Sequence, residues 1–320
     1  NRYPYPPKSY LLINDGNGKF SDATDVQAPQ LRKIGMVTSA SWAQLTGDSL
    51  PELIVVGEWM PITVFEDKQG NFQLAESSKF NLQNTEGWWN RIVKVDADHD
   101  GDLDFIAGNL GTNYKFHASK EKPFLVYCDD YDQNGTYDIV LAKYNGNDMV
   151  PVRGRQCSSE QVPSIAQKFP NYSSFADAKL KDIYGEGLEK GLSYKAHMFE
   201  SVFLRNDNGK FTIEPLPASC QFSTVQSILV EDFDGDGIQD LLIAGNLFNA
   251  EIETTRADAS VGVFYKGEKN NLFGKQLNPN ESGFYAPHDV KDIQSIRINN
   301  KPSVLVGINN NALYFFRNIK

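Results

Sequence analysis

A short acidic pattern that occurs three times constrains this chain more than any other feature of its sequence. The copies begin at Asp96, Asp130 and Asp232, and each reads D-x-D-x-[DN]-G-x-x-D before an apolar run. Carboxylates about 4 Å apart repel one another by about 1 kcal/mol per pair even in water. A bound cation is the simplest reason to keep them together. The apolar runs predict a buried strand after each acidic loop.

A second pattern consists of a strand, a turn rich in Asn, Asp and Gly, and another strand that opens on Phe. It recurs at residues 10–24, 62–76 and 202–216. Asn and Gly accept the positive φ that tight hairpin turns need. One unit therefore contains four short strands, with an acidic loop after the first. Such units, at a period of roughly 45 to 60 residues, are typical of propeller blades.

These motifs carry a resemblance to a known family. The segments "SYLLINDGNGKF", "GEWMPITVF", "RGRQCSSEQ" and "DFDGDGIQDLLIAGN" resemble FG-GAP/VCBS repeats, the blades of integrin-α-like propellers. Their order is similar to the C-terminal part of large bacterial secreted repeat proteins associated with ASPIC/UnbV domains. The resemblance implies a calcium-bearing propeller used in adhesion or as an extracellular scaffold, and it implies no reaction.

The expected fold is all-β: a β-propeller domain over residues 1–320 with about five four-stranded blades. Degraded units begin at Gln44 and Ile298. The first and last units are incomplete, so we expect the chain to be part of a larger propeller. The alternative is that residues 10–24 close the last blade.

Residues 149–197 do not fit a blade. Their helical spacing, with Phe175, Leu180 and Ile183 as an apolar stripe, predicts two short helices inserted within the third blade. The insertion would either cap an apolar blade edge or dock a partner.

The acidic loops have the oxygen donors that calcium prefers, and Gly lets each loop turn sharply. An EF-hand would need Glu at position twelve, where these loops have Ala107, Leu141 and Ile243. We predict two to three structural Ca²⁺ sites, and metal-free Asx turns are the alternative. The predicted ligands are Asp96, Asp98, Asp100, Asp102 (carbonyl) and Asp104, then Asp130, Asp132, Asn134, Thr136 (carbonyl) and Asp138, then Asp232, Asp234, Asp236, Ile238 (carbonyl) and Asp240.

Loops on one face of a propeller usually carry its function, and aromatic, amide and charged side chains are typical of glycan or peptide surfaces. Some of these side chains would instead fill the gaps between blades or form salt bridges. The candidate ligand-binding residues are Trp59, Asn109, Asn113, Tyr114, Asn147, Arg153, Arg155, Asn246, Glu251 and Arg256.

Composition excludes several functional classes. A net charge of -10 disfavours a nucleic-acid partner, and no apolar run approaches the ~20 residues of a transmembrane segment. Three cysteines are too few for a disulfide scaffold, although a Cys157–Cys220 bridge is an alternative to buried thiols. No nucleophile elbow or phosphate-binding loop is present in the sequence. Only Glu58, Asp148 and Glu251 suggest a catalytic carboxylate pair.

We therefore expect a non-enzymatic, calcium-stabilised binding or scaffold module that is extracellular, on the outer-membrane surface or in the periplasm. Its partner would be a protein or glycan of the cell envelope, or the missing part of its own propeller. One alternative is a carbohydrate-active protein, either lectin-like or a lyase or hydrolase. The other is a subunit of a larger outer-membrane assembly.

Overall fold

The computed structural model describes residues 3–98, 100–250, 253–269 and 271–318. It consists mainly of antiparallel strands with a few short helices, so the all-β expectation is confirmed. In this part of the chain, no helix combines the length and apolar character needed to cross a bilayer.

Four sheets follow one another along the chain. In each of them, the strands of the main path lie side by side in the order in which they occur in the sequence. Sheet I contains β3 (Met36–Ala43), β4 (Glu52–Met60), β5 (Thr63–Asp67) and β6 (Phe72–Leu74), with β7 (Gly87–Trp88) also paired to β4. Sheet II contains β8 (Arg91–Val95), β9 (Asp104–Gly108), β14 (Val202–Asp207) and β15 (Lys210–Pro215). Sheet III contains β16 (Ser227–Glu231), β17 (Asp240–Ala244), β18 (Val263–Glu268) and β19 (Asn271–Leu277). Sheet IV contains β20 (Val290–Ile298), β21 (Lys301–Ile308) and β22 (Tyr314–Phe316).

The sheets pack in the same order as they occur in the chain, because each second strand is apolar on both faces. In β9, Phe105 packs toward sheet I and Ile106 packs toward sheet III. The first strands β3, β8, β16 and β20 lie side by side in series. Side chains also join them: the backbone N–H of Ile92 donates to Ser39 Oγ (3.2 Å), and that of Ile293 donates to Ser227 Oγ (3.0 Å). Sheets I–IV therefore share apolar interfaces face to face.

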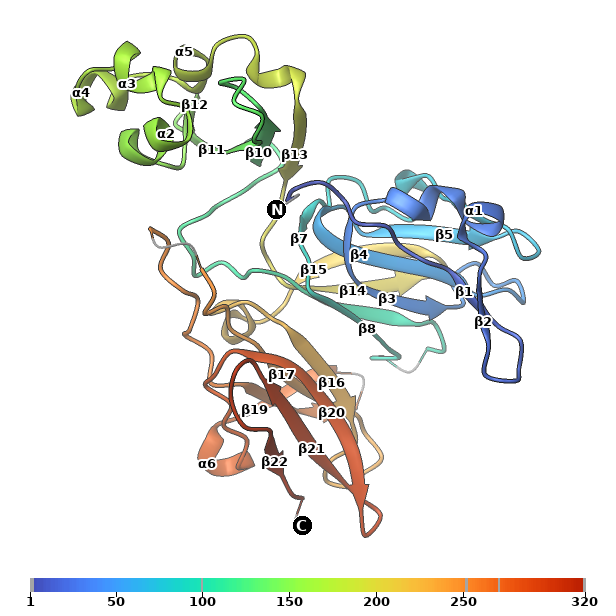
Figure 1. The fold of residues 1–320 in the computed structure, drawn as a ribbon. Coiled ribbons are helices and arrows are strands. Elements are labelled where there is room, and N and C mark those ends of the chain that lie inside the picture. The colour runs from blue at the N-terminus through green and yellow to red at the C-terminus, as the bar shows by residue number, and fades with distance from the viewer. Residues whose placement is uncertain (1–2, 99, 251–252, 270, 319–320) are drawn as a thin grey trace.

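A fifth sheet, which has four strands, is inserted between β9 and β14. This inserted sheet has the order β12-β11-β10-β13, from β10 (Phe124–Asp129), β11 (Asp138–Asn145), β12 (Asp148–Pro151) and β13 (Leu192–Ala196). Four short α-helices lie between β12 and β13: α2 (Arg155–Gln161), α3 (Ser164–Lys168), α4 (Tyr172–Ala176) and α5 (Leu180–Tyr184), and η3 (Leu188–Lys190) follows them. They gather beside the inserted sheet, away from sheets I–IV (Figure 1). The hairpin at 202–216 pairs with β9 of sheet II, so it completes the unit of the Asp96 loop.

An aromatic cluster joins the inserted sheet to sheet I. Trp59 and Trp88 come from the sheet I side, and Phe116, Phe124 and Phe199 come from the inserted segment and its two connections. Ring centroids lie 4.6 Å apart for Phe116 and Phe124, and 5.1 Å apart for Trp59 and Trp88. This packing fixes the inserted sheet to the rest of the molecule.

The first hairpin forms a two-stranded sheet of its own. It consists of β1 (Leu12–Asn14) and β2 (Phe20–Asp22), and α1 (Thr24–Gln27) and η1 (Pro29–Lys33) connect it to β3. Other short helices follow fourth strands in the same way: η2 (Ser77–Lys79), η4 (Ala218–Gln221) and α6 (Pro279–Ser282) come after β6, β15 and β19.

Candidate metal centre

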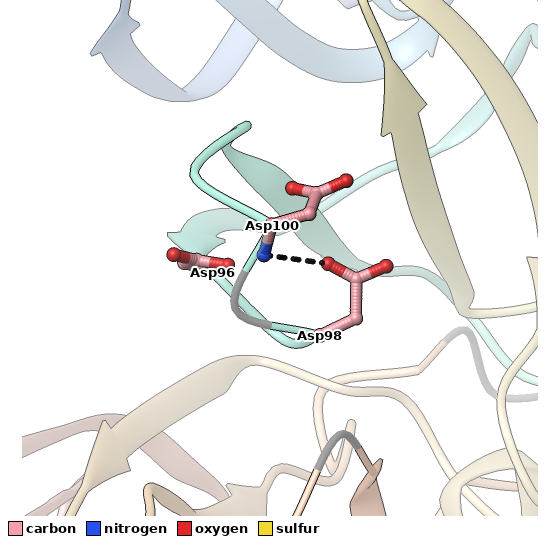
Figure 2. Close-up of side chains that lie close together, drawn as sticks. All are labelled: Asp96, Asp98 and Asp100. Carbon is pink, nitrogen blue, oxygen red and sulfur yellow. Dashed lines mark hydrogen bonds between the residues drawn. The ribbon is translucent and has the colours of Figure 1, made fainter.

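The three acidic loops occupy equivalent positions along the chain in three different sheets. Each connects a first strand to a second strand: β8 to β9, β10 to β11, and β16 to β17. In each loop, one carboxylate oxygen from each of three aspartates lies within 4.8 Å of the others. The groups are Asp96, Asp98 and Asp100, then Asp130, Asp132 and Asp138, then Asp232, Asp234 and Asp240. Figure 2 shows the first group.

Local hydrogen bonds explain why these sequences form tight loops. In the first loop, the backbone N–H of Asp102 donates to Asp100 Oδ1 (2.8 Å) and that of Asp100 donates to Asp98 Oδ1 (3.3 Å). Such Asx turns bend the chain at alternate residues. Gly101 then adopts a φ of +96°, which a side chain would strain. The equivalent Gly135 and Gly237 have φ of +88° and +85°.

The last aspartate of each loop is buried and connects the loop to the sheet. Asp104 accepts backbone N–H groups from Ala97 in the loop (3.1 Å) and from Asn206 in β14 (2.8 Å). Asp240 is held in the same way, by one N–H of its loop (3.0 Å) and one of β18 (2.9 Å). Burial raises the pKa of Asp104, Asp138 and Asp240. These carboxylates fix the loop relative to the strands.

Two basic side chains from third strands partly neutralise the first and third loops. Arg205 Nη1 lies 3.1 Å from Asp98 Oδ2. Lys266 Nζ forms ion pairs with Asp234 and, at 3.2 Å, with Asp236. Neither Arg205 nor Lys266 was predicted from the sequence to lie at an acidic loop. The available signal was a basic residue in the third strand, close to the hairpin turn.

One oxygen of the first loop has no donor in the part of the chain that the structure describes. Asp96 Oδ1 is buried and accepts no hydrogen bond there. A buried acceptor without a partner costs about 1–3 kcal/mol, and more when it is charged. A hard cation among Asp96, Asp98 and Asp100 would satisfy it. The donor set and the Gly turn fit calcium.

In each loop, the structure brings together the carboxylates of three predicted ligands. The other predicted ligands lie in the same loops: Asp102, Asp104, Asn134, Thr136, Asp236 and Ile238. The side chain of Asp102 accepts the backbone N–H of Asn208 (2.8 Å), in the β14–β15 turn. The Asn134 side chain accepts the N–H of Thr136 (2.8 Å). These side chains shape the loop.

Three of the predicted ligand-binding residues are buried and bonded to the protein itself. Trp59 is 4% exposed, and its indole N–H donates to the Tyr3 hydroxyl (2.7 Å). Asn109 and Asn246 are 0% exposed, and their amides bond to backbone groups around them. Their contacts give them a structural role.

Two arginines of this set hold the helical segment together. Arg155 Nε donates to the carbonyl of Phe169 (2.6 Å), and Arg153 Nη1 donates to Gln161 Oε1 (3.1 Å). Tyr114 packs edge-on against a phenylalanine of the aromatic cluster, with ring centroids 5.2 Å apart. These contacts place all three side chains within the inserted segment and its connections.

The remaining predicted ligand-binding residues are Asn113, Asn147 and Arg256, which are exposed, and Glu251, which lies outside the described residues. The exposed three are on separate loops. The loops of Asn113 and Arg256 meet, because Lys115 Nζ donates to the carbonyl of Glu253 (2.9 Å).

Of the suggested catalytic carboxylates, the two that the structure describes, Glu58 and Asp148, lie in different sheets. Glu58, in β4, accepts the hydroxyl of Tyr3 (2.6 Å), and burial raises the pKa of this carboxyl. Asp148, in β12, pairs with Lys179 (2.7 Å). Each acid is therefore held by its own partner. All three cysteines are free, so Cys157 and Cys220 do not form a bridge.

Comparison with known proteins does not assign this chain to a family. No protein-family model matches the chain, and no curated protein matches it either.

Proposed function

We propose that this chain is a calcium-stabilised β-propeller that serves as a binding or scaffold module outside the cell, without a reaction of its own. The observation that carries the proposal is the repetition of one loop. The same acidic turn, with three clustered carboxylates, connects the first and second strands of three sheets. A turn that only reversed the chain would not need this charge in all three places.

The arrangement of sheets I–IV supports the propeller. Each sheet runs in sequence order from its first strand outward, and the first strands lie side by side. Apolar side chains of neighbouring sheets face one another between them. Radial repetition of such sheets is the propeller architecture.

Calcium is the cation that these loops fit best. It accepts six to eight oxygen ligands in flexible geometry, whereas magnesium keeps its waters and demands an octahedron. Bound calcium would neutralise the clustered carboxylates and hold the end of each second strand. We expect dissociation constants of ~10⁻⁴ to 10⁻³ M, the range of extracellular modules.

The binding role follows from the exposed loops and the engaged acids. Asn113 and Arg256 offer amide and guanidinium groups on two loops that meet. Glu58 and Asp148 are each occupied by a partner within the protein. These features suit recognition of a protein or glycan at the cell envelope better than catalysis.

Direct measurement of bound calcium tests the proposal. Equilibrium dialysis with radioactive calcium should show two to three ions per chain, and the double variant Asp232→Asn/Asp234→Asn should bind one ion fewer. The matched control is Asp258→Asn, which changes an exposed aspartate paired with Arg256 outside the three loops. An absence of saturable binding, or the same number of ions in the double variant, would refute the proposal.

A further inference from the structure

The β1–β2 hairpin exposes apolar side chains, although its sequence has the hairpin motif that predicts part of a propeller blade. Tyr10 is 57% exposed, Leu12 52% and Phe20 62%. Figure 1 shows the hairpin projecting at the rim of the molecule beside sheet I. Among the described residues, β1 has β2 as its only strand neighbour.

The same motif elsewhere in the chain shows what normally covers these positions. The hairpin of β14 and β15 has the matching sequence "VFLRNDNGKF", and its Val202 and Leu204 are 0% exposed. Phe211, at the position of Phe20, is 2% exposed. In the β14–β15 hairpin these side chains pack against the face of sheet I and beside the apolar strand β9, with which β14 pairs.

The third strands of sheets I–IV all have this arrangement. The strands β5, β14, β18 and β22 pair antiparallel with β4, β9, β17 and β21, each over three residues. The short helix α1 follows β2, as short helices follow the fourth strands of sheets I–III. By sequence and by connection, β1 is a third strand that lacks its second strand.

The backbone of β1 presents this open edge. The N–H of Leu11 donates to Thr24 Oγ1 (2.7 Å), and its carbonyl accepts the N–H of Ala23 (2.9 Å). Leu11 therefore faces the β2 side. Because backbone groups alternate along a strand, those of Tyr10 and Leu12 face the open edge.

We infer that the β1 edge is a docking surface for a further repeat unit of the β8–β9 class. Its apolar second strand pairs antiparallel with residues 10–12. Its acidic loop reaches Asn14, as Asp104 accepts the backbone N–H of Asn206, the residue equivalent to Asn14. In sheets I–IV, each second strand already pairs with its own third strand. The unit that docks on β1 is therefore not one of these sheets. The inference rests on the proposed function only because it treats the sheets as repeats of one unit. Calcium binding to this chain is tested by a separate experiment.

A peptide with the sequence of residues 91–108 serves as the probe, because it contains a first strand, an acidic loop and a second strand. Fluorescence anisotropy should show saturable binding of the labelled peptide to the full chain. Leu12→Lys should weaken binding about tenfold or more. The matched control Val26→Lys changes a side chain that is 80% exposed in α1, off the edge, and should leave binding unchanged. Amide exchange at Tyr10 and Leu12 should slow when the peptide binds.

Both variants alter exposed positions, and circular dichroism verifies that they fold. The inference is overturned if no binding occurs up to roughly 1 mM peptide, or if both variants weaken binding equally. It is also overturned if sedimentation shows a dimer of the chain that Leu12→Lys dissociates, because the occupant is then a second copy. If the peptide fails to bind when the calcium sites of the chain are full, the docking surface is refuted and the calcium proposal is unaffected.

Discussion

Replacing Asn246 with alanine removes a buried amide that connects sheet III to sheet IV. Its Nδ2 donates to the carbonyls of Ser260 (2.9 Å) and His288 (3.0 Å), with a longer contact to that of Pro287 (3.3 Å). Its Oδ1 accepts the backbone N–H of Ser260 (3.2 Å). The amide therefore joins the β17–β18 connection to the segment before β20.

The size of the effect follows from the groups left behind. A hydrogen bond contributes about 0.5–1.5 kcal/mol net, and a buried partner left unsatisfied costs about 1–3 kcal/mol. Ser260, Pro287 and His288 are only partly buried, so water would reach some of the freed groups. We therefore expect Asn246→Ala to lower the free energy of unfolding by about 2–4 kcal/mol.

Urea unfolding followed by fluorescence measures this change, with Asn113→Ala as the control. Asn113 is exposed, and its side chain donates one hydrogen bond, to the carbonyl of Phe222 (3.1 Å). Its replacement should change stability by about 0.5 kcal/mol or less. The reasoning is refuted if Asn246→Ala costs no more than Asn113→Ala at an unchanged m value, because the buried amide would then contribute nothing measurable to the contact between sheets III and IV.

Two further predictions concern titratable groups. In the native protein, a thiol reagent should modify the partly exposed Cys157 first. Cys128 and Cys220 are buried, and burial raises the pKa of the Cys220 thiol to about 12. Mass spectrometry of labelled peptides measures the order of reaction, and equal rates for all three cysteines would contradict this prediction. Burial also raises the pKa of Glu58 above 4.5, so its ionisation disfavours the fold as pH rises above that value. Glu58→Gln keeps an acceptor for Tyr3 and should raise the melting temperature more at pH 7 than at pH 4; an equal change at both would show that Glu58 titrates normally.

The strands and turns of this chain could be predicted from its sequence because they depend on local patterns. The apolar run after Asp104 and the Asn-Gly turn near Asn208 each specify a strand or hairpin within a few residues. The pairing of β9 with β14 could not be predicted in this way. Residues 109–201 separate the two strands, and an apolar strand pattern does not say which strand will be its neighbour.

The acidic clusters were similarly predictable, because their aspartates lie close together in sequence. The buried amides were not. Asn109 and Asn246 each follow a second strand, where polar residues suggest an exposed loop, yet both are 0% exposed. Their partners come from other elements, such as the segment before β20, and only the tertiary structure brings these partners to them.

The most direct test of the account is thermal unfolding in excess calcium, in chelator and in excess magnesium. Calcium at 100 times its dissociation constant should stabilise the folded chain by about 2.7 kcal/mol per site. The account predicts a melting temperature that falls by several degrees in chelator, recovers fully with calcium and recovers less with magnesium. An unchanged melting temperature in all three conditions would show that the aspartate loops are metal-free turns.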